Sequence, residues 1–324
     1  MDLVGIARNP VPSGAIPGRF TARDGVSIRY ALWPRTADKR LGTVCLFGGR
    51  GEFIEKYFET ISDLRRRGFA VATMDWRGQG GSERLLSNQR KGHVEDFADY
   101  DRDLGQFMAE IVLPDCPAPY YGMAHSMGGH ILLRSALSKM CWFDRIIMSA
   151  PMIDVAQELA HAPLLRYLVE TQTILGLGDF FVPGGKAEPL EQESFEENKV
   201  TSDRLRHERV RDILKAAPWL GLGSPTVGWL NAAARSIMQV NAFGFASSVR
   251  VPLLIVAAGN DMVVSTRAIE SFAPRVKICR HLVVAGGKHE LLQERDPIRD
   301  QFWAAFDAYV PGSNRTMSEA HIGL

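Results

Sequence analysis

The sequence predicts an α/β protein, with a mostly parallel central sheet, helices on both faces and an inserted helical cap. Two observations predict this class. Short apolar runs typical of buried strands alternate with helical patterns from residue 43 to residue 149, and such alternation favours parallel strands joined by helices. The alternation stops over residues 152–245 and resumes at residue 251. A helical segment inserted into a sheet that is covered on both faces accounts for both observations.

The first half of the chain supplies most of the predicted sheet. A turn at Asp24-Gly25 separates two alternating segments, and later strands are short apolar runs. The predicted strands lie within residues 20–33, 43–47, 69–74, 120–123 and 145–149. Helical spacing of apolar residues predicts helices at about residues 52–67, 94–111 and 131–137.

The second half contains the insertion and the end of the sheet. Residues 152–245 include several helix-like segments and no clear strand, so we expect a cap over the catalytic edge of the sheet. Strands follow at residues 251–258 and 281–285, and a last helix at about residues 297–309. The expected division is an N-terminal extension, a core in two pieces, the cap and a flexible tail: residues 1–19, 20–151 with 246–310, 152–245, and 311–324.

Composition and charge exclude several classes of protein. The chain has 324 residues, of which 46% are hydrophobic and 23% are charged, as expected of a globular protein with a large core. The formal net charge of +1 argues against a nucleic-acid partner. Neither a signal peptide nor a membrane-spanning run is recognisable, so we expect a cytoplasmic protein. The four cysteines are scattered without metal-ligand spacing, which favours free thiols and no metal.

A serine lies at a predicted strand-to-helix junction, in the segment Ala-His-Ser-Met-Gly-Gly of residues 124–129. Small residues on both sides of a serine permit a sharp turn, a nucleophile elbow, in which the hydroxyl stands clear of the sheet. Ala124 occupies the position where the common pattern Gly-x-Ser-x-Gly has its first glycine, and such a turn accommodates one methyl group. We therefore interpret Ser126 as a nucleophile, against the alternative of an idle serine in a small-residue turn.

A serine hydroxyl needs a base in contact with it and an acid that orients the base. After such an elbow the usual chain order is serine, acid, histidine. Asp261 follows the predicted strand 251–258 in a short loop, and His289 follows the last strand in a glycine-rich loop. Both positions lie at carboxyl ends of strands, where the sites of open α/β sheets assemble. We predict Asp261 as the acid and His289 as the base.

Two alternatives to these residues remain open from the sequence. Asp154 also follows a strand and could orient the histidine, although it opens the predicted cap. His125 lies inside the elbow, but its position beside the serine directs it away from the line of attack. The other histidines fit roles in packing, capping or solvent contact.

An oxyanion hole requires two backbone N–H groups directed at the developing negative charge. Met127 supplies one by its place after Ser126, and the glycine-rich loop at residues 48–51 is expected to supply the other. We favour the Arg50 amide, with Gly49 as the alternative. The loop lacks a Walker lysine and dinucleotide spacing, so we expect no bound nucleotide.

Five segments together are typical of one known group of enzymes: residues 49–52, 75–82, 124–129, 259–261 and 288–290. On these segments the chain resembles the lysophospholipase and monoacylglycerol-lipase branch of the α/β-hydrolases, also called the serine aminopeptidase S33-like group, over about residues 20–310. The resemblance implies the α/β-hydrolase fold, the triad Ser126, Asp261 and His289, and oxyanion amides from Arg50 and Met127. Many relatives have His-Gly before the oxyanion residue, whereas this chain has Phe47-Gly48-Gly49, so the choice between Gly49 and Arg50 stays open.

The expected activity is hydrolysis of a carboxylic ester through an acyl-enzyme, without a cofactor. The substrate is expected to be a small acyl ester or lipid, foremost a lysophospholipid or monoacylglycerol, and peripheral contact with a membrane fits such a substrate. The sequence indicates no oligomeric state. An acyl-chain surface or simple cap packing could explain the apolar cap residues Phe180, Phe181, Trp219, Leu164, Leu165 and Leu168.

Three other functions compete with this expectation. A short-chain carboxylesterase would use the same residues. An aminopeptidase-like hydrolase would need acidic cap residues for a substrate ammonium, and candidates are Glu188, Glu191, Glu193, Glu196 and Glu197. A non-catalytic binding protein is disfavoured because such proteins typically lose a catalytic residue, and all three are present here.

Overall fold

The computed structural model describes residues 2–36, 41–137, 141–155, 170–189 and 192–313. The cap residues Leu164, Leu165, Leu168 and Glu191 and the tail residues 314–324 lie outside the described residues. Ser313 is buried and its hydroxyl donates to Asp307, so the expected flexible tail does not begin at residue 311.

Eight strands form one sheet, in the order β1-β2-β4-β3-β5-β6-β7-β8. β1 and β2 are an antiparallel hairpin and β2 pairs antiparallel with β4, whereas all later neighbours are parallel. This confirms the predicted mostly parallel sheet. The strands are β1 (Ile16–Thr21), β2 (Ser27–Trp33), β3 (Thr43–Phe47), β4 (Ala70–Met74), β5 (Tyr120–His125), β6 (Arg145–Ser149), β7 (Leu253–Ala258) and β8 (Cys279–Val284).

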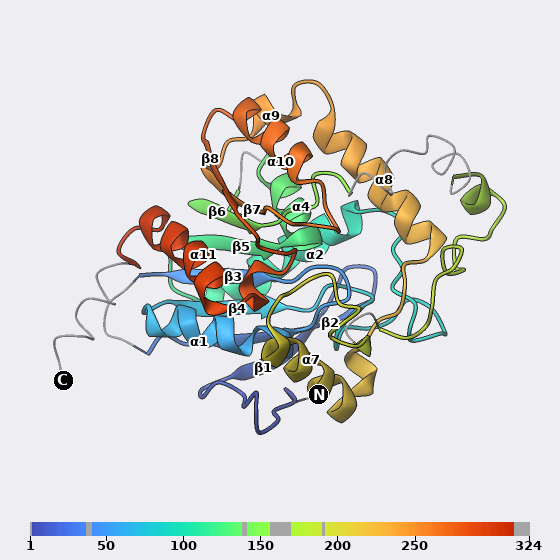
Figure 1. Ribbon diagram of the computed structural model, residues 1–324, viewed down its shortest axis with the longest axis horizontal. Helices are drawn as coiled ribbons and strands as arrows, with labels where there is room; N and C mark the ends of the chain where they lie inside the picture. Colours follow the sequence, from blue (N-terminus) through green and yellow to red (C-terminus); the bar gives the residue numbers. More distant parts are fainter. Residues whose placement is uncertain (1, 37–40, 138–140, 156–169, 190–191, 314–324) are drawn as a thin grey trace.

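Helices cover both faces of the sheet (Figure 1). One face carries α1 (Phe58–Arg66) and α11 (Asp296–Tyr309), and the other carries α2 (Ala98–Phe107), α4 (Ser126–Ser135) and α10 (Thr266–Phe272). Because both faces are covered, central strands are apolar throughout: in β3, Val44 and Leu46 join one core cluster and Cys45 and Phe47 join the other.

Several predicted boundaries differ from those observed. β1 begins at Ile16, so the core reaches back into the expected N-terminal extension of residues 1–19. The helix expected at residues 52–67 begins as a 3-10 turn, η1 (Ile54–Tyr57), because Phe53 is extended and the Glu52 side chain turns back to the Gly49 amide. The helix expected at residues 94–111 begins at Ala98, where Asp96 accepts the backbone N–H, and continues into the π-helical segment η2 (Met108–Val112).

The segment between β6 and β7 carries helices and, where it is described, no strand of the sheet. Its described helices include α7 (Arg204–Ala216), α8 (Val227–Asn241) and the short α9 (Phe245–Ser248), and residues 170–174 are also helical. α7 packs Val210, Ile213 and Leu214 around Phe53, which follows the glycine-rich loop after β3. The inserted segment therefore contacts the loop that the sequence assigns to the site.

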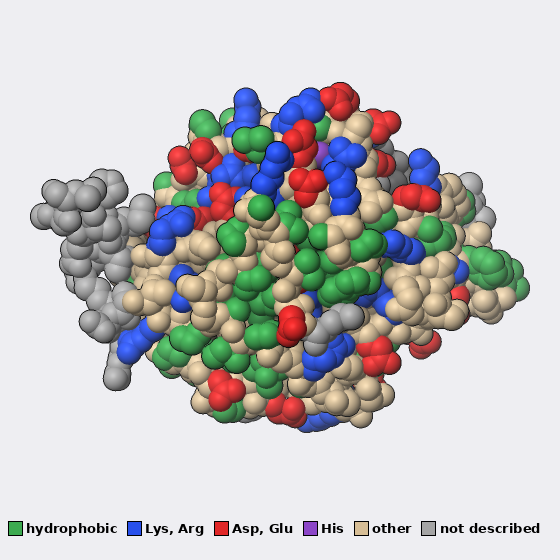
Figure 2. Space-filling view, turned by 90° about the horizontal axis from the view of Figure 1, so that it is seen from below, with side chains coloured by type: hydrophobic (Ala, Val, Ile, Leu, Met, Phe, Trp, Pro, Cys, Tyr) green, Lys and Arg blue, Asp and Glu red, His purple; other side chains and the backbone are tan. Residues whose placement is uncertain are grey.

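Two surface properties bear on possible partners. Among the helices that the structure describes, none is long and apolar enough to cross a bilayer. Figure 2 shows Lys and Arg side chains interspersed with Asp and Glu over the face seen from below, without a field of one sign. This mixture agrees with the formal net charge of +1.

Candidate active site

Ser126 lies at the junction of β5 and α4, where the sequence places it. Its φ of 51° is in the left-handed region, a strained conformation that non-glycine residues adopt mainly at functional sites. Gly128 permits the loop after β3 to approach, because a Cβ there would lie 2.5 Å from the carbonyl oxygen of Gly48. Ala124 is wholly buried, so the core accommodates its methyl group.

The structure brings His289 and Asp261 to this serine. His289 Nε2 lies 3.0 Å from Ser126 Oγ, and His289 Nδ1 lies 2.7 Å from Asp261 Oδ2. The other carboxylate oxygen of Asp261 accepts the backbone N–H groups of Val263 and Val264, at 2.8 and 2.9 Å. Burial alone would raise the pKa of Asp261, but hydrogen bonds from His289 and these amides hold it below its usual value. Asp261 is therefore a fixed anion beside the imidazole.

Asp154 and His125, the two alternatives from the sequence, make other contacts than those of Asp261 and His289. The Asp154 carboxylate accepts the N–H of Val155, and its backbone carbonyl accepts the N–H of Ser265. His125 Nδ1 lies 3.1 Å from the Ser149 carbonyl oxygen, and its ring centroid lies 4.6 Å from that of His289. Burial lowers the pKa of His125 to about 4, so this ring adds no charge beside His289 near neutral pH.

Two side chains, Glu52 and Gln79, hold the glycine-rich loop after β3 by hydrogen bonds. The Glu52 carboxylate accepts the Gly49 N–H. On the opposite side, Gln79 Nε2 donates to the Gly49 carbonyl oxygen at 2.7 Å, and Gln79 Oε1 accepts the Gly51 N–H at 3.2 Å. In a planar trans peptide the C=O and N–H groups point in opposite directions. The Arg50 N–H, which shares a peptide group with the Gly49 carbonyl, is therefore directed away from Gln79.

Two further contacts position this loop. The Arg50 guanidinium donates to the Gly223 carbonyl oxygen at 2.8 Å and lies over the Trp229 ring, so the inserted segment fastens its side chain. Gly49 lies directly against the elbow, because a Cβ at Gly49 would be 3.1 Å from Ser126 Cβ. Met127, on the other side, lies in the first turn of α4, where backbone N–H groups have no partner within the helix.

A buried charge network joins the glycine-rich loop after β3 to the loop of His289. Lys56 Nζ lies 2.8 Å from the Glu52 carboxylate and 2.7 Å from that of Glu290, the neighbour of His289. Burial alone would raise the pKa of Glu52, but the Lys56 ammonium and the neighbouring donors lower it below its usual range. The Glu52 carboxylate therefore stays charged at neutral pH. Its contact with Lys56, and the contact of Lys56 with Glu290, link two segments that are far apart in sequence.

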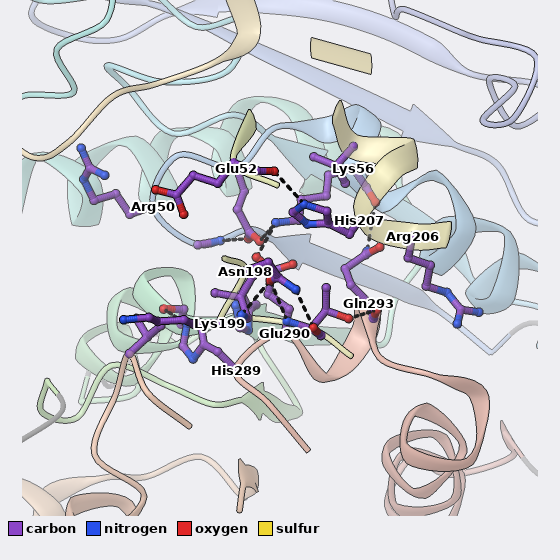
Figure 3. Close-up of a pocket in the computed structure, with 18 residues that line it drawn as sticks. Arg50, Glu52, Lys56, Asn198, Lys199, Arg206, His207, His289, Glu290 and Gln293 are labelled. Atoms are coloured by element: carbon purple, nitrogen blue, oxygen red, sulfur yellow. Dashed lines mark hydrogen bonds and ion pairs between the residues drawn. The ribbon is translucent and has the colours of Figure 1, made fainter. Parts of the chain in front are cut away.

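Ser126 is one of the residues that line a cavity of about 280 Å³. Figure 3 shows the lining residues as sticks. Residues of the glycine-rich loop after β3, of the His289 loop and of the inserted segment form its wall. The polar and charged lining residues include Arg50, Lys56, Glu193, Asn198, Lys199, Arg206, His207, His289, Glu290 and Gln293.

Of the apolar cap residues singled out from the sequence, Phe180, Phe181 and Trp219 are described and do not line this cavity, whereas the smaller Val200 and Val210 do. Phe180 and Phe181 lie under the Lys91 ammonium, 5.3 Å from each ring centroid, and Trp219 lies under the Arg29 guanidinium. Of the acidic run, Glu193 lines the cavity, whereas Glu196 pairs with Arg204.

Comparison with known proteins identifies the family. Residues 38–296 match the family described as serine aminopeptidase, S33. The chain belongs to this family. Its S33 relatives include lysophospholipase L2 of Escherichia coli K12, 31% identical over 306 residues, which are 91% of this chain and 86% of that protein. The probable lysophospholipase L2 of Haemophilus influenzae is 26% identical over 274 residues, 85% of this chain and 84% of that protein.

Solved structures show that this S33 member has the α/β-hydrolase fold. A monoglyceride lipase from Saccharomyces cerevisiae superposes with a TM-score of 0.71 at 18% identity, covering 94% of this chain and 96% of that one. A carboxyl esterase from Bacillus coagulans has a TM-score of 0.73 at 18% identity, covering 93% and 99%. The expected fold and family are thereby confirmed.

Sequence reasoning missed the residues that support the S33 site. Gln79 lies in the glycine-rich segment of residues 75–82, which carries the family resemblance but was given no role at the site. The pair Glu52 and Lys56 has the i,i+4 spacing of a helical ion pair, which is a readable signal. Lys199 lies in the inserted segment, where no pattern indicated that its side chain reaches the cavity.

Proposed function

We propose that the protein hydrolyses the acyl ester of a lysophospholipid or monoacylglycerol, with Ser126 as nucleophile, His289 as base and Asp261 as orienting acid. The observation that carries this proposal is the continuous hydrogen-bonded chain from Ser126 Oγ through the imidazole to Asp261, at 3.0 and 2.7 Å. A hydroxyl, imidazole and carboxylate in this order form a Ser-His-Asp arrangement for acyl transfer.

Each residue then has one role. Ser126 Oγ attacks the ester carbonyl while His289 Nε2 takes its proton, and Asp261 stabilises the imidazolium that forms. His289 returns the proton to the departing alcohol, which leaves the acyl group on Ser126. Water attacks this acyl-enzyme by the same route and releases the fatty acid. His289 must be unprotonated at Nε2 to accept the serine proton.

The amides of Arg50 and Met127 receive the oxyanion in this proposal. Gly49 is the weaker candidate, because its N–H already donates to the Glu52 carboxylate. Gln79 holds the opposite end of the peptide group that contains the Arg50 N–H. Gln79 is therefore a positioning residue, and the Glu52 network supports the loop from the other side.

Replacing Gln79 with alanine is expected to lower kcat by about 10- to 100-fold, less than the 10²–10³ typical of losing an oxyanion donor outright. KM should change little, because the amide acts on the transition state. Steady-state kinetics on a p-nitrophenyl ester measures both. Gln301→Ala, an exposed residue of α11, is the matched control. A rise in KM at constant kcat would contradict the positioning role.

The relatives favour a lipid ester over the alternatives. Lysophospholipase L2 aligns with nearly the whole chain, so the comparison includes the inserted segment that helps to line the cavity. One observation supports the aminopeptidase hypothesis: Glu193 lies on the cavity wall. A short-chain carboxylesterase would use the same Ser126, His289 and Asp261.

Substrate profiling tests this assignment. The native protein should hydrolyse a lysophospholipid or a monoacylglycerol with a higher kcat/KM than p-nitrophenyl acetate or an alanine p-nitroanilide. If kcat/KM is highest for the anilide, the aminopeptidase hypothesis is favoured. If kcat/KM is highest for the acetate, the short-chain esterase hypothesis is favoured.

Cytoplasmic location and peripheral membrane contact belong to the same proposal. Lipid substrates reside in or near membranes, and the inserted segment exposes Ile174 (80%), Leu175 (69%) and Phe180 (59%). Exposed apolar side chains of this kind can contact a lipid surface.

A further inference from the structure

We propose that the cavity beside Ser126 holds the zwitterionic head group of a lysophospholipid, with Lys199 binding the phosphate and Glu193 the ammonium. The inference rests on the proposed function, because it assigns the leaving group of that reaction. It narrows the substrate from acyl esters in general to those whose alcohol carries an anionic phosphodiester and a cationic amine.

The cavity reaches the imidazole beside which the leaving alcohol must lie. His289 Nε2 returns a proton to the departing oxygen, so this oxygen must lie next to the imidazole. The wall of the cavity includes His289 together with Glu290 and Gln293, which follow it in the chain. A head group attached to the departing oxygen therefore enters this cavity, whose wall also includes Gly49, Arg50 and Ser126.

The size of the cavity agrees with a head group. Pockets that enclose a whole drug-sized ligand occupy about 300–1,000 Å³. This cavity, at about 280 Å³, lies just below that range and matches a glycerophosphate-sized group better than an entire lysophospholipid.

Most of the charge on the wall is already neutralised. The Lys56 ammonium contacts both Glu52 and Glu290. Figure 3 shows the Arg206 side chain directed away from Asn198 and Lys199. Its guanidinium pairs with three carboxylates: Glu59, Asp203 and Asp296. These cations hold the fold together and cannot bind a phosphate without giving up their partners.

The charged groups of Lys199 and Glu193 are not held by ion pairs in the way that Lys56 and Arg206 are. Over the described ranges of the chain, neither side chain forms an ion pair, whether with each other or with another residue. Both line the cavity together with Arg50, whose guanidinium is engaged by the Gly223 carbonyl and the Trp229 ring. The wall therefore offers a ligand the ammonium of Lys199 and the carboxylate of Glu193. An ammonium group of lysine binds phosphate as a point charge, and a carboxylate pairs with an alkylammonium. A monoacylglycerol has neither complementary group.

The backbone that carries these two side chains is fixed relative to His289. The Val200 carbonyl accepts the N–H of Glu290 at 2.8 Å, and the Thr201 hydroxyl donates to the Gln293 carbonyl at 2.7 Å. At the other end, the Glu193 carbonyl lies 3.1 Å from His207 Nε2. Residues 193–201 thus form a fixed wall, on which only the side chains of Lys199 and Glu193 need to move to meet a ligand.

The test compares three substrates with the same acyl chain below their micellar concentrations: a lysophosphatidylethanolamine, a lysophosphatidylglycerol and a monoacylglycerol. The measured quantity is kcat/KM for the native protein, Lys199→Gln and Glu193→Gln. Lys277→Gln, an exposed lysine outside the cavity, is the matched control. We expect Lys199→Gln to lower kcat/KM about tenfold for both phospholipids and less than twofold for the monoacylglycerol. Glu193→Gln should lower it about fivefold for the ethanolamine lipid alone.

The outcomes separate this inference from the proposed function. Hydrolysis of none of the three lipids by the native protein would overturn the proposed function. Hydrolysis with the same kcat/KM ratios in native protein and Lys199→Gln would overturn the head-group assignment and leave the proposed function intact. Equal losses on all three lipids would also overturn the assignment, because they indicate a general disturbance of the site. A Glu193-dependent activity on an alanine p-nitroanilide that exceeds the lipid activity would favour the aminopeptidase.

Discussion

Replacing Ser126 with alanine is expected to lower kcat for ester hydrolysis by about 10⁶-fold, the loss typical of removing a nucleophilic serine. Without the hydroxyl no acyl-enzyme forms, and the remaining oxyanion amides accelerate only the attack of water. Hydrolysis of a p-nitrophenyl ester measures the effect. The variant should remain folded, because among the described residues the Ser126 hydroxyl forms a hydrogen bond only with His289.

Ser248→Ala serves as the matched control for that experiment. Ser248 is an exposed serine at the end of α9, whose hydroxyl donates to the Gly244 carbonyl oxygen. We expect this variant to keep its activity. Equal rates for native protein and Ser126→Ala would contradict the assignment of the nucleophile.

Replacing Asp261 with asparagine is expected to lower kcat by about 10⁴-fold, as in other Ser-His-Asp sites. The Asp261 carboxylate accepts a hydrogen bond from the N–H at His289 Nδ1 and so holds the imidazole in the tautomer whose unprotonated Nε2 faces Ser126. An asparagine amide can donate to Nδ1 and favour the opposite tautomer, which leaves a proton on Nε2 and removes the base. KM should change much less than kcat.

Asp154→Asn is the informative control, because Asp154 also follows a strand and could have been the acid. Its carboxylate contacts the Val155 amide, and the structure places Asp261 at the imidazole instead. Activity of Asp154→Asn within about twofold of native is expected. Loss of activity in Asp154→Asn together with an active Asp261→Asn would reverse the assignment.

The convergence of Ser126, Asp261 and His289 could be anticipated from the sequence because each follows a strand that is recognisable by its apolar run. Parallel strands bring their carboxyl ends to one edge of the sheet, so chain order and loop context were sufficient to place the three together. The start of β1 was harder to predict from the sequence, because Pro17 and Gly18 weaken the strand pattern before residue 20.

The oxyanion loop shows what sequence reasoning could not reach. The choice between Gly49 and Arg50 depends on where Glu52 and Gln79 direct their side chains, and both contacts arise only after the loop and the turn of residues 75–82 fold against each other. Lys199 and Glu193 posed a similar difficulty. They belong to irregular backbone in the inserted segment, whose position is set by contacts with the His289 loop rather than by a repeating pattern.

The most direct test of the central claim is to trap the acyl-enzyme. Native protein mixed with a p-nitrophenyl ester of a fatty acid, acid-quenched within the first turnover and digested, should yield one peptide whose mass is increased by the acyl group, modified at Ser126. Ser126→Ala should yield no acylated peptide. Acylation at another residue, or turnover in native protein without any acylated peptide at Ser126, would contradict the account.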